Sequence, residues 1–286
     1  MRGGGIRRLR RAAQVGTVLA FLVIPLLNVR EMYYFVGNMA AFNAGGIPLA
    51  DPLAMFQVAV ATFSVTEAML VGAGLSLLLA VIMGPVFCSW LCPFGLLSET
   101  FHRDKKDRWA AETVSAKPFL ARAAIVIAGL VSIFLFAPTP FLTQLSMPAW
   151  FTRFWQHAIT HRDVLWPAVV LVPSVLLLEF AVGKRLWCRY LCPQSVLISL
   201  AGLALPTRLH VRFTRRKCTC PGSDQLCRKA CSLGLNPKHT SHAQKVQCTN
   251  CGDCVDACNA RGKALDLGFS RIANPSEKGQ DLHGKP

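Results

Sequence analysis

The chain has 286 residues, of which 52% are hydrophobic and only 16% charged, and its mean hydropathy is +0.38. This composition excludes an ordinary soluble protein and points to membrane helices. The formal net charge of +16 does not indicate nucleic-acid binding, because membrane proteins gather Lys and Arg on their cytoplasmic side. We therefore expect a protein that contacts the lipid bilayer and binds no nucleic acid.

Four apolar segments each approach the ~20 residues that cross a bilayer. They are Ala12–Val29, Val65–Phe87, Phe119–Pro138 and Val164–Val182. The first follows a basic start and could imitate a signal peptide, but no small-x-small cleavage site closes it, so we interpret it as an uncleaved anchor. The sequence thus predicts an all-α, four-helix membrane domain over residues 1–206.

Basic residues predict the orientation of these spans. They gather before the first span and between the second and third: Arg2, Arg7, Arg8, Arg10, Arg11, Arg103, Lys105, Lys106, Arg108 and Lys117. The other two connections, 38–63 and 139–163, are poor in them, so both termini are expected in the cytoplasm and the protein in the inner (cytoplasmic) membrane. The basic run from Arg208 to Lys217 is interpreted as a solvated collar against anionic headgroups.

The most specific motif follows that collar. Cysteines 248, 251, 254 and 258 have the bacterial ferredoxin spacing C-x2-C-x2-C-x3-C. The first three can hold three irons of one [4Fe–4S] cube, while the fourth points to a second cluster. Zinc also accepts four thiolates, but its usual paired spacing fits less well. Residues 207–286 are therefore expected to form a cytoplasmic, ferredoxin-like α+β domain with a polar tail.

A second, less regular motif precedes the first. It consists of Cys218, Cys220, Cys227 and Cys231, and only its final C-x3-C spacing matches a ferredoxin. The exchange rule assigns Cys231 to the cube of Cys248, Cys251 and Cys254, and Cys258 to the cube of Cys218, Cys220 and Cys227. Alternatively, Cys218 and Cys220 are free thiols beside a single cluster.

The remaining four cysteines form a repeated motif. Cys88-Ser-Trp-Leu-Cys92-Pro93 follows the second span, and Cys188-Arg-Tyr-Leu-Cys192-Pro193 follows the fourth, 100 residues later. Matching aromatic and leucine neighbours indicate a duplicated helical hairpin. Cysteines at i and i+4 share one helical face, so the two pairs could meet in one redox or metal site. The alternative is that they are inert buried thiols.

These residues resemble the NapH/MauN family of ferredoxin-type membrane proteins. The similarity includes Ile47-Pro-Leu-Ala-Asp51-Pro52-Leu, the motif that ends at Pro93 and the motif that ends at Cys258. It implies electron transfer from the quinol pool, as in a quinol dehydrogenase, or from a protein donor. The partner would belong to a methylamine-utilisation or periplasmic nitrate-reductase system, and the irregular motif from Cys218 to Cys231 favours the MauN type.

A quinol releases protons as well as electrons, so an ionisable acceptor is expected near the membrane. Glu67 and Glu179 are the candidates, although each could simply pair at an interface. His157 and His161 could bind haem or metal but are more simply read as solvated. Two other functions stay open: a maturation factor that reduces cysteines or metal in a client enzyme, and a structural zinc anchor.

Overall fold

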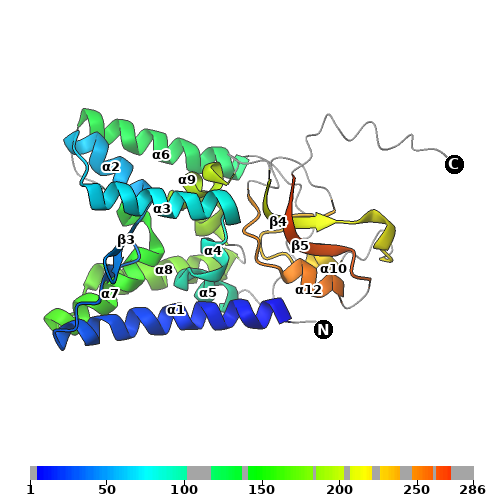
Figure 1. Ribbon diagram of the computed structural model, residues 1–286, viewed down its shortest axis with the longest axis horizontal. Helices are drawn as coiled ribbons and strands as arrows, with labels where there is room; N and C mark the ends of the chain where they lie inside the picture. The colour runs from blue at the N-terminus through cyan, green and yellow to red at the C-terminus, as the bar shows by residue number, and fades with distance from the viewer. Residues whose placement is uncertain are drawn as a thin grey trace.

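The computed structural model describes residues 5–101, 117–136, 141–182, 185–202, 207–220, 226–238, 247–259 and 262–271. Figure 1 shows a long helical part whose one end meets a smaller part around strands β4 and β5. The described chain is mostly helical. Arg2, Arg103, Lys105, Lys106, Arg108 and the tail beyond residue 271 lie outside the described residues.

Four helices occupy the predicted spans: α1 (Gly5–Val29), α3 (Glu67–Met83), α6 (Lys117–Leu135) and α8 (Trp166–Val182). Among the described helices, α1 alone is long and apolar enough by itself to cross a membrane, and the apolar stretches of the other three are shorter. Length and composition therefore support one span, and the four-helix anchor stays a prediction.

The helical part is built from two similar halves. In the first half, α1 leads through strands β1 (Phe35–Asn38), β2 (Ala41–Ala44) and β3 (Ile47–Ala50) and helix α2 (Pro52–Thr62) to α3. In the second half, α6 leads through the 3-10 turn η2 (Leu142–Leu145) and helix α7 (Met147–His161) to α8. Each half then ends in a cysteine motif and a short helix, α5 (Pro93–Phe101) or α9 (Gln194–Ala201).

The three strands form an antiparallel sheet, β1-β2-β3, that packs against the helices (Figure 1). Strand β3 lies directly on α3, because Gly72 has no side chain there: a Cβ at this position would approach the backbone nitrogen of Ala50 to 2.9 Å. Asp51 follows β3 and caps α2, accepting a hydrogen bond from the Leu53 amide at 3.1 Å. The connection between α1 and α3 thus folds back into the helical part, which the sequence did not predict.

Apolar packing joins the two halves. One cluster of buried side chains combines α2, α6 and α9 through Leu53, Val126 and Val196. A second cluster combines Phe94 of α5 with Met147 of α7 and Val175 of α8. The short helices α5 and α9, which directly follow the two cysteine motifs, are therefore each packed against helices of the helical part.

The smaller part consists of antiparallel strands β4 (Thr207–Phe213) and β5 (Leu265–Arg271), the 3-10 turn η4 (Arg215–Lys217) and helices α10 (Leu226–Lys229) and α12 (Asp253–Asn259). Its core is made largely of cysteines, with Cys227, Cys254 and Cys258 buried beside Val255 and Leu265. A part this small has little apolar core of its own, which is typical of domains that a bound metal or cofactor helps to stabilise.

Candidate iron–sulfur site

The regular cysteine loop owes its shape to two residues with positive φ. Asn250 has φ +52° and Gly252 has φ +80°, a conformation that Gly and Asn adopt most readily. A Cβ on Gly252 would approach the side chain of Ile6 to 2.4 Å, so the loop also packs tightly on the start of α1. The Asn250 amide donates to the carbonyl oxygens of Met83 (3.2 Å) and Leu209 (2.8 Å). The loop is thereby held between α3 and β4.

Four thiols line one cavity of about 60 Å³ beneath this loop: Cys231, Cys248, Cys251 and Cys254. The remaining walls are mainly apolar and include Val211, Leu233 and Leu235. Burial raises the pKa of Cys248 to about 11 and that of Cys251 to about 12. The Leu235 amide donates to the Cys231 sulfur at 3.3 Å. Cys254 is buried and the other three cysteines are half-buried. Four such thiols around one apolar cavity, with an N–H donor to one sulfur, fit a [4Fe–4S] cluster.

The structure also brings together Cys218, Cys220, Cys227 and Cys258. Cys227 and Cys258 are buried, and Cys218 packs against them. Burial raises the pKa of Cys227, and the charges of Cys258 and Cys220 raise it further. Cys218 and Cys220 are half-buried. The two groups match the pairing expected from the exchange rule, while ligation itself stays a prediction.

The two repeated motifs fold in the same way. Helix α4 (Phe87–Trp90) ends in a hydrogen bond from the Cys92 amide to the Phe87 carbonyl at 3.0 Å, and the π-helical turn η3 (Trp187–Leu191) ends in one from Cys192 to Trp187 at 2.8 Å. Both are i to i+5 bonds, a wide turn that is frequent at functional sites. The motifs are thus separate turns rather than the regular helix expected from the i, i+4 spacing.

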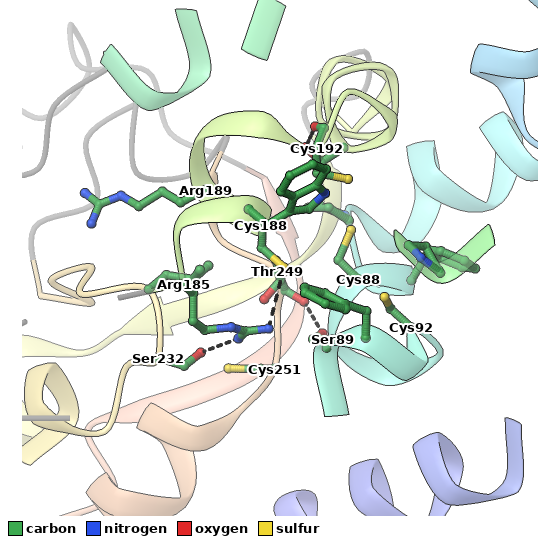
Figure 2. Close-up of a pocket in the computed structure, with 18 of the residues that line it drawn as sticks. Cys88, Ser89, Cys92, Arg185, Cys188, Arg189, Cys192, Ser232, Thr249 and Cys251 are labelled. Atoms are coloured by element: carbon green, nitrogen blue, oxygen red, sulfur yellow. Dashed lines mark hydrogen bonds between the residues drawn. The ribbon is translucent and has the colours of Figure 1, made fainter. Parts of the chain in front are cut away.

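Both cysteine pairs line a single pocket of about 60 Å³, together with Cys251 of the ferredoxin loop (Figure 2). Burial, together with the charge of Cys188, raises the pKa of Cys88 to about 11. The guanidinium groups of Arg122 and Arg185 oppose this shift, and Arg185 contacts the Cys188 sulfur at 3.9 Å. The pocket therefore holds four thiols beside buried positive charge, which suits an anionic group.

Hydrogen bonds connect the repeated motifs directly to the ferredoxin loops. The Ser89 hydroxyl donates to the Thr249 carbonyl at 2.6 Å, and the Trp90 indole donates to the Asn250 carbonyl at 3.2 Å. Just before the second motif, Arg185 donates to the Ser232 hydroxyl at 3.3 Å (Figure 2). The repeated motifs and the ferredoxin-type part therefore form one continuous site.

Among the residues that the structure describes, no group of three or more His, Cys, Asp or Glu side chains could hold one metal ion. Four sulfurs around one zinc would lie roughly 4 Å apart, given Zn–S bonds of about 2.3 Å. In a cube each sulfur binds a different iron, so the sulfurs stand farther apart.

A buried ionic network ties α1 to this site. Arg10 is 2% exposed and donates to both oxygens of Glu99 at 2.7 Å, and also to Asp253 at 3.1 Å. The neighbouring Arg7 amide donates to Asp256 at 2.7 Å. Sequence reasoning treated Arg10 only as a topology signal. In the structure it joins α1, α5 and α12.

The interpretation of Arg208 as part of a solvated collar is wrong. Arg208 is 2% exposed, and its charge lowers the pKa of Cys248. Its neighbours Arg212, Arg215 and Arg216 are exposed, as expected of a collar. Arg208 stands near the start of β4, where its guanidinium lies against Gly84 and Gly202 of the helical part, whereas Arg212 lies toward the other end of the strand.

The other candidates lie apart from the thiols or are already paired. Glu179 is fully buried and accepts hydrogen bonds from the Ser98 hydroxyl (2.7 Å) and the Trp187 amide (2.9 Å). Glu67 is exposed in the first turn of α3, at the opposite end from Cys88. The rings of His157 and His161 lie 4.8 Å apart near the end of α7.

Comparison with known proteins agrees with this site. Residues 66–110 and 164–212 both match the family described as "4Fe-4S binding domain". The two matches contain Cys88 and Cys92 in one case and Cys188 and Cys192 in the other, so they support the duplication. No solved structure matches the chain.

Several curated proteins are similar over much of the chain. MauN of Paracoccus denitrificans, a methylamine utilization ferredoxin-type protein, is 29% identical over 216 residues, covering 71% of this chain and 69% of MauN. The ferredoxin-type protein NapH of Haemophilus influenzae is 23% identical over 265 residues, covering 87% of this chain and 85% of NapH. The chain is a homologue of the MauN and NapH ferredoxin-type proteins.

A third relative is longer. YccM of Escherichia coli is 26% identical over 197 residues, which are 64% of this chain but only 51% of YccM. The chain therefore spans about half of the length of YccM. The similarity to MauN and NapH confirms the resemblance inferred from the sequence.

Proposed function

We propose that the protein is a membrane-bound iron–sulfur electron carrier that passes electrons from a quinol or a protein donor to a redox partner. The observation that carries this proposal is the shared pocket, in which Cys88, Cys92, Cys188 and Cys192 meet Cys251. Electron transfer needs redox groups in close succession, and these thiols form a continuous series between the helical part and the ferredoxin-type part.

The proposed anchor consists of α1, α3, α6 and α8, within residues 1–206. Large apolar side chains project outward from all four helices, for example Leu19 (55% exposed), Leu78 (53%), Ile127 (63%) and Leu177 (68%). Polar groups instead lie inside, among them Gln57 and Glu179, each fully buried. Apolar patches of this extent do not normally face water, and a polar interior with an apolar exterior is typical of membrane bundles.

The proposed cofactors are two [4Fe–4S] clusters in the domain of residues 207–286. Cluster 1 would be held by Cys218, Cys220, Cys227 and Cys258, and cluster 2 by Cys248, Cys251, Cys254 and Cys231. We further propose that Cys88, Cys92, Cys188 and Cys192 hold an additional iron–sulfur centre. When bound, such clusters accept and donate single electrons.

The surrounding residues have definable roles in this scheme. Arg122 and Arg185 supply positive charge that favours thiolates in the shared pocket. Ser89 and Trp90 hold the ferredoxin loop against the first motif through the carbonyls of Thr249 and Asn250. These contacts keep the thiols of both parts in a fixed relation, which rapid electron transfer requires.

The system served is proposed from the relatives. The names of the MauN relatives refer to methylamine utilization, and the higher identity to MauN (29%) than to NapH (23%) favours that system over a periplasmic nitrate reductase. The alternative function is maturation, in which the same centres reduce cysteines or metal in a client enzyme. A deletion strain with normal electron flow but an inactive client would favour this alternative.

Topology gives a first test. We expect both termini in the cytoplasm, so green fluorescent protein fused after Pro286 should fluoresce. The connection 38–63 is then expected on the periplasmic side, so alkaline phosphatase inserted between Gly45 and Gly46 should be active. This turn should tolerate the insertion, because nothing lies within 4 Å of a Cβ placed on either glycine. Phosphatase activity after Pro286 would contradict the orientation.

Iron and sulfide analysis gives a second test. Three cubes predict about 12 iron and 12 sulfide per chain, whereas two predict about 8 of each. The double variant Cys88→Ser, Cys188→Ser should therefore lose about 4 of each and keep the rest. Zinc without iron or sulfide would contradict the whole scheme.

A further inference from the structure

A large apolar cavity lies between α1 and α3. Its volume is about 310 Å³, and its walls include Phe21 of α1, Phe42 of β2, Leu79 of α3 and Phe87 of α4. An apolar cavity of about 150 Å³ already binds benzene. This cavity is therefore large enough for a substituted aromatic ring.

The cavity is lined in part by apolar side chains that solvent can reach, so it is not sealed. Three of its lining side chains, Leu79, Met83 and Leu91, are 48%, 39% and 42% exposed. In the proposed anchor, the apolar exterior of the helical part faces lipid. A ligand that enters from the lipid must itself be lipophilic.

One carboxyl group lines this apolar space. Asp51 is 5% exposed, and its Oδ1 accepts the Leu53 amide at 3.1 Å. Its Oδ2 is buried and has no hydrogen-bond partner in the described part of the chain. Leaving a buried carboxyl oxygen unpaired is costly. The site therefore favours a ligand that offers a hydroxyl group at this point.

The environment of Asp51 also places its titration near neutrality. Burial raises the pKa of Asp51 to about 7, against the opposing effects of the Leu53 amide and the nearby Gln194 side chain. Neither group makes a hydrogen bond to Oδ2. Among the described residues that line the cavity, drawn from α1, the sheet, α3, α4 and α9, no other carries a charge. The remaining polar ones are Thr17, Ser76 and Gln194.

The cavity adjoins the pocket of thiols. Phe87 and Gln194 line both spaces. Phe87 directly precedes Cys88, and Leu91 directly precedes Cys92. A ring bound in the cavity would thus be separated from the cysteines of the first motif by little more than these side chains.

We propose that this cavity binds the ring of a lipophilic hydroquinone or quinone, with Asp51 Oδ2 hydrogen-bonded to one of the ring's oxygens. This inference rests on the proposed function and assigns the donor site within it. An acyl chain would fill the space but leave Oδ2 unpaired. Non-helical backbone at membrane depth is tolerated where it is buried in protein or lines a cavity. Strands β2 and β3 meet this condition, because they form part of the cavity wall.

The two ring states should respond to pH in opposite directions. A hydroquinone hydroxyl donates best to the carboxylate, so its binding should strengthen as pH rises. A quinone carbonyl only accepts, so it needs protonated Asp51, and its binding should weaken. Between pH 6 and pH 8 the carboxylate fraction of a group with pKa about 7 rises from about 0.1 to about 0.9, so each affinity should change by about tenfold.

The test uses the full iron-loaded protein in detergent and decyl-ubiquinone as the probe. Quinone binding is measured on oxidised protein, and hydroquinone binding on protein reduced beforehand with dithionite, both by equilibrium gel filtration. Asp51→Asn keeps a cap for α2, and its amide can both donate and accept. It should bind both ring states without dependence on pH.

A matched pair of variants tests the location. Ala80 is buried in the cavity wall, whereas Ala68 lies exposed on the same helix, outside the cavity. Ala80→Phe should abolish binding of both ring states, and Ala68→Phe should leave it intact. If Ala80→Phe does not fold, the pH profile of Asp51→Asn still decides the question.

The inference is overturned if wild-type affinity does not change between pH 6 and pH 8, or if Asp51→Asn keeps the wild-type pH profile. Failure to bind the probe while iron, sulfide and dithionite reduction are normal would also overturn it, and would leave the electron-transfer proposal standing. Protein that lacks iron and sulfide would instead contradict the proposed function.

Discussion

Replacing Cys92 and Cys192 together with alanine should stop electron delivery from hydroquinone to the ferredoxin-type clusters without removing those clusters. Both thiols line the shared pocket next to Cys251. Loss of an outer-shell partner alone costs about 10–100-fold in metal affinity or activity, so loss of two proposed ligands should lower the rate by more than about 100-fold. The rate of cluster reduction after rapid mixing measures this effect.

The control for this variant is Leu191→Ser, which changes a neighbouring residue that is 38% exposed and does not line the pocket. Its rate should be close to wild type. Dithionite should reduce the ferredoxin-type clusters fully in both proteins. A double alanine variant with the wild-type rate and normal protein level would mean that these cysteines are small buried hydrophobic residues with no redox role.

Arg10→Met should weaken the attachment of the ferredoxin-type part to the helical part. Arg10 is the common partner of Glu99 and Asp253, and all three side chains are buried. Removing one member of a buried ionic network leaves the other charges uncompensated, which costs about 3–5 kcal/mol. Guanidinium-induced loss of cluster absorbance should therefore begin at a clearly lower concentration than in wild type.

Two further variants make the Arg10 result specific. Arg11 is 35% exposed and lies 3.9 Å from Glu99, so Arg11→Met should cost less than about 1 kcal/mol. The triple variant Arg10→Met, Glu99→Gln, Asp253→Asn removes all three charges and should recover part of the lost stability. An Arg10→Met protein as stable as wild type would show that the network contributes nothing.

Several features of the site could be predicted from the sequence because they depend on local spacing. The apolar segments coincide with α1, α3, α6 and α8 to within a few residues at most ends. The grouping of Cys231 with Cys248, Cys251 and Cys254 followed from the ferredoxin spacing. The repeated motif was visible because Cys88 and Cys188 stand in nearly the same local sequence.

Other features depend on contacts between distant residues and carry no local signal. Strands β1 to β3 have only four residues each, which is too short for a clear alternation of apolar and polar positions. In the sequence, Asp51 has the features of an ordinary helix cap. It lines a cavity only because β3 packs against α3, which is a contact between distant residues. Glu67 and Glu179, the proton acceptors expected from the sequence, both lie within predicted spans, whereas Asp51 lies outside them.

The bond between Arg10 and Asp253 also has a consequence for how the protein is made. The two residues are 243 positions apart, so α1 leaves the ribosome long before its partner exists. Contacts this distant form late. Asp253 stands between Cys251 and Cys254, whose thiols line one cavity. We expect insertion of the proposed cluster there to accompany completion of the contacts that Arg10 of the first helix makes.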